Sequence, residues 1–281
     1  MNTSPVHMTS AVSARKPFGA QIREWRQRRH LSQMDLAAQA GMSTRHLSFL
    51  ETGRSHPSRA MLLRLAERLS VPLRERNALL IAAGFAPMYS MHSLSDPAMS
   101  SARSAVDLIL NGHEPFPAML VDRHWNLVAS NRAMAPMLEG ADPSLLTPPL
   151  NVLRVTLHPK GVAPRIVNLA EIREHVLDRL QREFELTADE KLRALLEELR
   201  SYPGNEGDTS GEEPVSYGGV VVPLKLRTPA GVITLFSTTT VFGTPTEVTL
   251  SELMLEAFYP ADEFSASVLR QAAASTATAD T

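Results

Sequence analysis

The sequence predicts two domains: a mainly α-helical domain of five short helices in residues 16–86, and an α+β domain with an antiparallel sheet in residues 112–265. The first prediction rests on five segments with apolar residues at helical spacing, which Gly, Ser and Pro residues separate. The second rests on two long strand-like segments, residues 220–227 and 232–241, which follow two amphipathic helices and are joined by a Pro-Ala-Gly turn. Strands, helices and then strands in this order are typical of an α+β domain.

The N-terminal helices have recognisable start and stop signals. Ile22 and Trp25 share one apolar side of the first helix, and serine or proline residues introduce the later helices, as is usual at helix N-termini. Gly84 ends the last helix. We expect helices over residues 18–29, 33–40 and 44–51, a fourth after Pro57-Ser58 and a fifth from Pro72.

The second and third of these helices form a helix-turn-helix pattern. Ala37 is small where the two helices must approach, Gly41 supplies a turn with positive φ, and the hydroxyl of Ser43 can cap the next helix. Leu47 and Leu50 bury the inner face of that helix. The outer face, which in such a motif lies against the major groove of DNA, then consists of Thr44, Arg45, Ser48 and Phe49.

This segment resembles the Xre/phage-repressor type of DNA-binding domain. The resemblance covers about residues 16–83 and is carried by the Ser32-Gln33 start, the Ala37/Gly41/Leu47/Leu50 frame and the Leu50-Glu51-x-Gly53-Arg54 end. It implies that Gln33 lies at the DNA backbone and reaches an adenine edge, and that Arg54 contacts a phosphate. The alternative for Gln33 is a polar residue in the first turn of a solvated helix.

The outward residues differ in the DNA contacts expected of them. Arg45 is the main candidate for reading a base, because its planar guanidinium can bond O6 and N7 of guanine together. Thr44 and Ser48 are candidates for bonds to bases or phosphates, and Phe49 either contacts a thymine methyl or packs on the following loop. Phosphate contacts position a protein without reading sequence, and the candidates for them, with plain solvation as the alternative, are Arg23, Arg26, Arg54 and Arg59.

Charge is distributed unevenly along the chain. Residues 15–76 hold 13 Lys and Arg against 5 acidic residues, a net charge of +8, so the rest of the chain carries −10 of the overall −2. A basic segment joined to an acidic one indicates that binding to a double-stranded DNA operator is confined to the first domain.

The composition excludes several classes of site. The chain has no cysteine, so it forms no disulfide, thiolate nucleophile or zinc ribbon. It has no secretory signal and no apolar run near the roughly 20 residues of a membrane span, so we expect a cytoplasmic, nucleoid-associated protein without membrane contact. Nucleotide-binding and nucleophile-elbow motifs are absent, and the helical pair Glu171/His175 lacks a third metal ligand. We therefore expect no cofactor, no metal and no enzymatic activity.

The C-terminal part contains shorter elements. Residues 87–111 are expected to form a linker and a connecting helix that starts at Asp96-Pro97. Strands over residues 118–121 and 127–129 flank a hairpin turn, and residues 152–157 form a β-branched apolar segment. We expect helices over residues 131–138, 169–184, 188–199 and 251–257, a loop over residues 202–214, and disordered tails over residues 1–15 and 266–281.

Three segments carry a second resemblance: Pro-Ala-Met-Leu-Val-Asp-Arg-His-Trp-Asn-Leu-Val-Ala-Ser-Asn at residues 117–131, Asn-Val-Leu-Arg at residues 151–154, and Phe-Ser-Thr-Thr-Thr-Val-Phe-Gly at residues 236–243. They are similar to the MmyB-like ligand-binding domain that follows an Xre-type domain in many regulators. This resemblance covers about residues 96–265. It implies a PAS-like fold with a pocket for a small, often apolar molecule such as a fatty acid.

Nine residues are candidates for contacting that ligand. Arg132 is a candidate for pairing with a ligand carboxylate, against the alternative of a surface ion pair. Thr238 belongs to a threonine run along an expected strand, one face of which must point inward or meet a ligand; the alternative is ordinary strand sequence. The apolar candidates for lining the pocket, with ordinary core packing as the alternative, are Met119, Val121, Trp125, Met134, Leu138, Phe236 and Phe242.

These features predict a sequence-specific DNA-binding regulator, acting as a repressor and a homodimer and controlled by a small, mainly apolar ligand. Two alternatives stay open. The second domain serves only dimerisation or partner binding, which a filled core without a cavity would favour. In the other alternative, the second domain is an enzyme fused to a DNA-targeting domain. This would need a set of catalytic residues that the sequence does not display.

Overall fold

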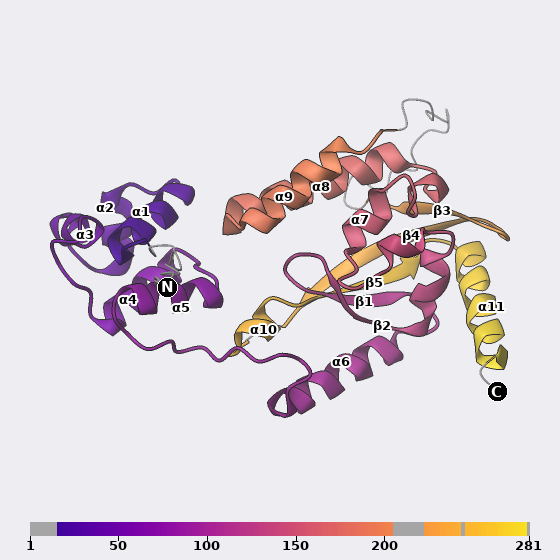
Figure 1. Ribbon diagram of the computed structural model, residues 1–281, viewed down its shortest axis with the longest axis horizontal. Coiled ribbons are helices and arrows are strands. Elements are labelled where there is room, and N and C mark those ends of the chain that lie inside the picture. Colours follow the sequence, from indigo (N-terminus) through magenta and orange to yellow (C-terminus); the bar gives the residue numbers. More distant parts are fainter. Residues whose placement is uncertain (1–15, 205–221, 243–244, 280–281) are drawn as a thin grey trace, which may run out of the picture. The chain divides into compact units, whose positions relative to one another are not determined.

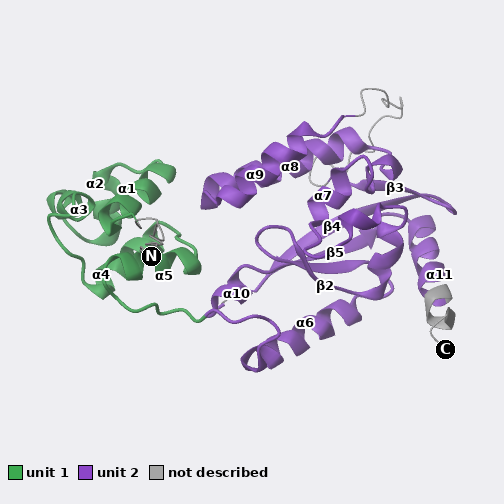
Figure 2. Ribbon diagram, in the orientation of Figure 1, with its two compact units in different colours: residues 1–90 green, residues 91–281 purple. Residues whose placement is uncertain are grey.

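A computed structural model describes residues 16–204, 222–242 and 245–279 of the chain. The chain divides into two compact units, residues 1–90 and 91–281 (Figure 2). The tail expected over residues 1–15 lies outside the described residues, as does most of the loop expected over residues 202–214. None of the helices within the described ranges is both long and apolar enough to cross a membrane.

The first unit contains the five expected helices. Side-chain hydroxyls cap three of them: Ser32, Ser43 and Ser58 each accept a hydrogen bond from the backbone N–H three residues later. Ser32 and Asp35 form a reciprocal capping box. The helices are α1 (Phe18–Arg28), α2 (Gln33–Ala40), α3 (Thr44–Glu51), α4 (Arg59–Arg68) and α5 (Leu73–Ala82).

Two glycines of this unit occupy positions where another residue would be strained or would clash. Gly41, at φ +66°, ends α2 in the left-handed conformation that glycine adopts without strain. At Gly19 in α1 the limit is space, because an added Cβ would lie 2.3 Å from the carbonyl oxygen of Leu50 in α3. Leu47 and Leu50, the predicted inner face of α3, are fully buried.

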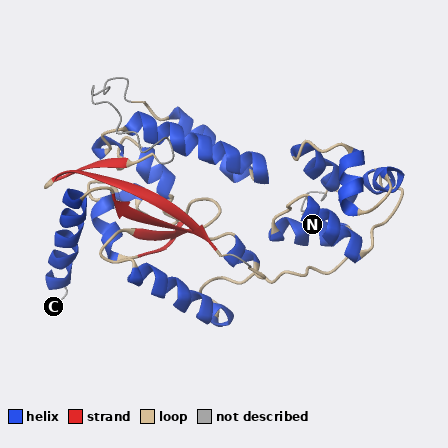
Figure 3. Cartoon of the chain, turned by 180° about the vertical axis from the view of Figure 1, so that it is seen from behind, coloured by secondary structure: helices blue, strands red, loops and turns tan. Residues whose placement is uncertain are grey.

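The second unit is built around a five-stranded antiparallel sheet with the order β2-β1-β5-β4-β3. Figure 3 draws its strands in red. Its strands are β1 (Ala118–Val121), β2 (Leu127–Ser130), β3 (Leu224–Thr228), β4 (Gly231–Val241) and β5 (Met254–Pro260). Its α-helices are α6 (Ser100–Gly112), α7 (Val152–Leu157), α8 (Leu169–Thr187), α9 (Glu190–Ser201), α10 (Val248–Ser251) and α11 (Glu263–Ala279), with 3₁₀ turns η1 (Pro97–Met99), η2 (Arg132–Leu138), η3 (Pro143–Leu145) and η4 (Ala163–Arg165).

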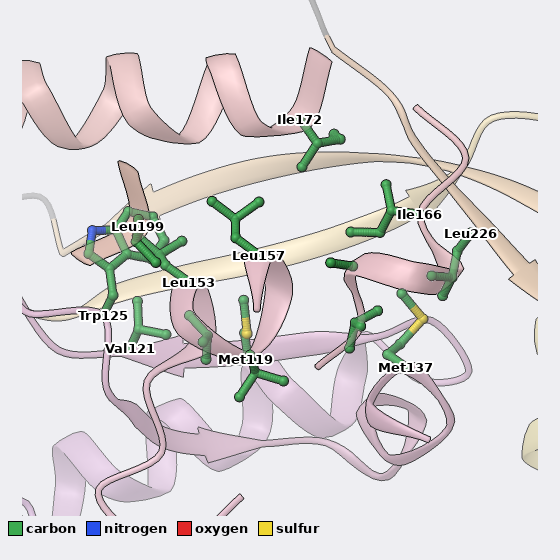
Figure 4. Close-up of a cluster of buried hydrophobic side chains, with 14 of the residues drawn as sticks. Met119, Val121, Trp125, Met137, Leu153, Leu157, Ile166, Ile172, Leu199 and Leu226 are labelled. Atoms are coloured by element: carbon green, nitrogen blue, oxygen red, sulfur yellow. The ribbon is translucent and has the colours of Figure 1, made fainter. Parts of the chain in front are cut away.

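Helices cover both faces of the sheet, α8 and α9 on one side and α6 on the other (Figure 1). Side chains alternate between the two faces along each strand. Met119 and Val121 of β1 therefore belong to the larger core under α7, α8 and α9, whereas Ala118 and Leu120 pack with α6. Figure 4 shows the larger core, with Ile172 projecting from α8 toward the strands.

The expected helix over residues 251–257 is wrong. Met254–Pro260 is β5, the central strand of the sheet, and only the short α10 precedes it. Leu255 and Ala257 face α6 while Glu256 faces α8. A strand covered on both faces has little polar alternation, so its apolar run resembles that of a buried helix.

Other segments also differ from the sequence expectations. Residues 152–157, β-branched and apolar, form α7. Residues 263–279 form α11, which packs against β4, β5 and η2, where a tail was expected from residue 266. The expected helix over residues 131–138 is the 3₁₀ segment η2, and Asn131 does not cap it. The Asn131 side chain instead accepts from the N–H of Ala118 and donates to the carbonyls of Leu110 and Phe116, so it joins β1 to the end of α6.

Candidate functional sites

Helix α3 exposes part of one face to solvent. Thr44 and Arg45 are exposed, and Ser48 and Phe49 are half-buried. The guanidinium carbon of Arg45 lies 5.4 Å from the centre of the Phe49 ring, a cation–π distance. This stacking holds Arg45 along the outer side of α3, where the sequence places the reading face. It also gives Phe49 a contact on its own helix, which neither of the two sequence interpretations considered.

A buried ion pair ties together the three helices around this face. Nε and Nη2 of Arg26 donate to the two carboxylate oxygens of Glu51 over 2.7 and 2.9 Å, and the Glu51 side chain is only 2% exposed. The hydrogen bond to Glu51 raises the pKa of Arg26. Gln33 Nε2 donates to the same carboxylate over 2.8 Å. The first residue of α2 is thereby fixed against the last residue of α3.

The structure corrects one expected phosphate contact. Arg26 was predicted to clamp a phosphate together with Arg23, yet it is buried in the pair with Glu51 and is not available to DNA. The sequence could not separate the two arginines, because charge alone does not say which side of α1 each one occupies.

The other arginines predicted to contact DNA are exposed and have no acidic partner among the described residues: Arg23, Arg45, Arg54 and Arg59. Arg54 directly follows the turn after α3, where its backbone N–H donates to the carbonyl of Phe49 over 2.8 Å. Unpaired guanidinium groups on a surface attract phosphate oxygens and release counterions when they bind them.

The second unit contains a cavity of about 110 Å³ between the sheet and helices α7 and α8. This volume exceeds the space that a single water molecule needs. Most of its wall is apolar and comes from four strands (β1, β3, β4 and β5), from both helices and from the segments beside them. The apolar lining residues are Met119, Trp125, Val152, Leu153, Ile172, Val176, Val222, Leu224, Leu235 and Phe258.

One part of the cavity wall is polar and charged. Arg179 of α8 donates from Nη1 to Glu256 over 3.1 Å, from Nε to Glu183 over 3.3 Å and from Nη2 to the hydroxyl of Thr239 over 3.1 Å. Its guanidinium carbon lies 4.3 Å from the centre of the Trp125 ring, and the indole N–H of Trp125 donates to Glu183 over 2.8 Å. These contacts bind α8 to the sheet at this end of the cavity.

Trp125 has an unusual backbone for an aromatic residue. Its φ is +65°, a conformation that bulky side chains rarely adopt and that costs free energy. Hydrogen bonds on both sides of the residue hold this conformation, from Trp125 N–H to Asp122 and from Val152 N–H to the Trp125 carbonyl. The result is a buried indole that lines the cavity.

Of the nine residues predicted to contact a ligand, the structure brings two, Met119 and Trp125, to the cavity. Val121, Met134 and Leu138 lie elsewhere in the surrounding core. Arg132 pairs with Glu114 over 3.0 Å, in line with the surface alternative.

The remaining three predicted residues lie on the opposite face of the sheet from the cavity. Phe236 and Thr238 of β4 are paired with Tyr259 and Ala257 of β5, residues of the face covered by α6, and Phe242 packs on that face as well. The residues of β4 that line the cavity are the odd-numbered Leu235 and Ser237.

Other cavity residues carried a signal that the sequence interpretation did not use. Ile172, His175, Val176 and Arg179 follow one another at helical spacing along α8, so a charged side chain shares a helix face with apolar ones. Glu256 was hidden by the assignment of its segment to a helix, since only a strand would alternate Glu256 with the buried Leu255 and Ala257.

Comparisons with known protein families agree with this division. Residues 17–79 match the family model of a helix-turn-helix domain, and residues 102–272 match that of the MmyB-like transcription regulator ligand binding domain. No curated protein matches the chain. The helix-turn-helix domain indicates binding to DNA, and the second match extends over more than half of the chain. The chain therefore belongs to the DNA-binding transcription regulators that have an MmyB-like ligand-binding domain.

Proposed function

We propose that a small, mainly apolar molecule in the cavity of the second unit controls how tightly this regulator binds its operator. The observation that carries the proposal is the cavity itself: an apolar space of about 110 Å³ with one charged end, inside the domain that matches a ligand-binding family. Pockets of this kind, mostly apolar with a few placed polar groups, are typical of small-molecule sites. A fatty acid is one example of such a ligand.

In the proposed DNA complex, α3 lies in the major groove. Arg45 bonds a guanine edge, and Thr44, Ser48 and Phe49 contact neighbouring bases or phosphates. Gln33 lies at the backbone, with its amide nitrogen already held by Glu51 and its carbonyl oxygen left to accept a further bond. Arg23, Arg54 and Arg59 contact phosphates.

The proposed regulation is a coupling free energy between the two sites. The protein acts as a homodimeric repressor, and the ligand favours one geometry of the dimer. That geometry sets the separation of the two α3 helices, which must match half-sites about one duplex turn, ~34 Å, apart. A ligand that binds both geometries equally would change nothing, however tightly it is held.

The test is to fill the cavity without touching the DNA-binding surface. Val176→Phe places a larger side chain into the cavity from α8. We expect this variant to bind an operator selected from random duplexes as the original protein does, and to lose the change in affinity that small molecules extracted from the purified protein produce. The matched control is Val268→Phe, on the α11 side of the same core but not lining the cavity.

Because a larger side chain can destabilise a core by overpacking, thermal melting of both variants must first show that each one is folded. A folded Val176→Phe protein that still responds to ligand would contradict the proposal. If no extract or compound changes operator affinity in the original protein, the second unit is a dimerisation or partner-binding module.

A further inference from the structure

We propose that Arg45 and Phe49 of α3 act as one recognition unit, which selects a guanine whose neighbouring base pair contains a thymine. Arg45 bonds the edge of the guanine, and the Phe49 ring contacts the 5-methyl group of the thymine. This inference rests on the proposed role of α3 in the major groove, and it specifies a step of two base pairs that each operator half-site must contain.

Phe49 is an aromatic residue that the core of the first unit does not use. Its neighbours on α3, Leu47 and Leu50, are fully buried in that core. Phe49 is half-buried, yet it does not belong to the apolar side chains of the described residues that pack on the core. The contact that the structure gives its ring is with Arg45. The ring therefore lies on the outer side of the helix without a role in holding the fold together.

Arg45 keeps its hydrogen-bond donors available while the ring holds its position. Its guanidinium carbon lies over the Phe49 ring, and none of its N–H groups donates to a residue within the described ranges. A guanidinium has five N–H donors, two of which match O6 and N7 of guanine. Contact with the ring reduces the freedom that Arg45 would otherwise lose on binding. The side chain is therefore prepared for a bidentate contact to guanine.

The contact between the two side chains determines that the bases they read are neighbours. The guanidinium carbon of Arg45 is 5.4 Å from the centre of the Phe49 ring, a distance at which the two groups touch. A base pair lying between the two that are read would need a gap of about 3.4 Å, the rise of one step, between the side chains. Apolar contact with the thymine methyl is the contact that phenylalanine makes in the major groove. Together the two residues therefore select a guanine next to a thymine.

Modified operators test the inference with the unaltered full-length protein. An operator is first selected from random duplexes, and each thymine of one half-site is then replaced in turn by deoxyuridine, which removes only the 5-methyl group. We expect one replacement, next to a guanine, to weaken binding about fourfold, which is the value of burying one methyl group. Thymines that are not next to this guanine are the internal controls.

Variants of the protein assign each base to its side chain. Phe49→Ala should bind thymine and deoxyuridine equally at the sensitive position. Replacing the adjacent guanine by 7-deazaguanine, which lacks the N7 acceptor, should weaken binding by the unaltered protein but not by Arg45→Ala. Phe49→Ala should also reduce this effect of 7-deazaguanine about two- to fivefold, because Arg45 loses the ring that holds it.

Two further variants complete the comparison. Ile81→Ala removes an exposed apolar side chain of α5 and should keep both effects, so it is the matched control. Thermal melting shows whether Phe49→Ala is folded. Phe49→Leu keeps an apolar side chain but lacks the ring, so the effect of 7-deazaguanine should fall in this variant as well.

Two results overturn the inference and leave the proposed binding to DNA in place. In the first, no deoxyuridine next to a guanine weakens binding. In the second, the sensitive thymine keeps its effect in folded Phe49→Ala, or 7-deazaguanine keeps its full effect in Phe49→Leu. Selection that yields no preferred sequence would instead overturn the proposed function, and the recognition unit with it.

Discussion

Gln33 Nε2 donates to Glu51 Oε2 over 2.8 Å, so a residue at the start of α2 is held by a residue at the end of α3. Glu51 is held in turn by two hydrogen bonds from Arg26 of α1. A side chain fixed before binding loses less conformational entropy on binding than a free one. The Gln33 side chain is therefore held in place by two residues that are themselves buried.

Removing the charge of Glu51 should destabilise the first unit. Glu51→Gln leaves the Arg26 guanidinium buried without a charged partner, which typically costs about 3–5 kcal/mol. We expect a lower melting temperature and weaker binding to all DNA sequences, measured by circular dichroism and by gel retardation. The control is Glu67→Gln on the exposed side of α4. Identical melting of Glu51→Gln and the original protein would contradict this role.

Arg45→Ala should remove specific operator recognition and leave the fold intact. Arg45 is exposed and makes no bond that supports the core, so melting should not change. Loss of a bidentate contact to guanine typically costs about 1–3 kcal/mol of base discrimination. Footprinting of the variant beside Arg68→Ala, an exposed arginine of α4, provides the comparison. The prediction fails if the Arg45→Ala footprint keeps its sequence preference.

DNA binding should be confined to the first unit, as the charges of the two units suggest. Residues 16–86 alone should bind DNA weakly and with a steep dependence on salt, because guanidinium–phosphate contacts release counterions. Affinity should fall below that of the full chain, since a monomer contacts one half-site whereas the proposed homodimer contacts two. A fragment of residues 91–281, which retains α11, should not bind. Retardation of DNA by that second fragment would refute this division.

The Arg154–Glu198 pair should make folding sensitive to acid. Two hydrogen bonds from Arg154, of 2.6 and 2.7 Å, hold the pKa of Glu198 below its usual value, with a smaller contribution from the Tyr202 hydroxyl and with burial opposing both. Because the carboxylate is favoured in the folded state, its contribution is complete above about pH 4.5 and is lost as the pH falls through the lowered pKa.

Urea unfolding of Glu198→Gln measured from neutral pH down to about pH 3 should therefore show a shallower loss of stability than the original protein. The neighbouring Glu197→Gln, which changes a largely exposed carboxylate, is the control. Parallel pH profiles for Glu198→Gln and the original protein would contradict the assignment.

The helices of the first unit were predictable because their signals are local. Ser32, Ser43 and Gly41 mark helix ends within a few residues of sequence, and the structure places the helix boundaries close to those signals. The role of Arg26 was not predictable in this way, since its partner Glu51 lies 25 residues away and is brought close only by the packing of α1 against α3.

The cavity was harder to predict because it depends on pairings between distant strands. A threonine run such as Thr238–Thr240 signals a strand but not which residues face inward, and only the register with β5 assigns Ser237 to the cavity and Thr238 to the opposite face. The central strand itself was mistaken for a helix. Met119 and Trp125 were found because they lie on the well-marked β1 hairpin.

The close approach at Gly19 has a consequence for how binding specificity changes. The three atoms nearest to a Cβ added at position 19 belong to the backbone carbonyl groups of Leu50 and Glu51. Position 19 should accept glycine alone in a library of random substitutions. Thr44, Arg45 and Ser48, in contrast, can be exchanged as a set without altering the packing of α3 against α1. With the DNA contacts proposed above, new target sequences would be accessible through a few substitutions on one helix face, with the scaffold beneath it left unchanged.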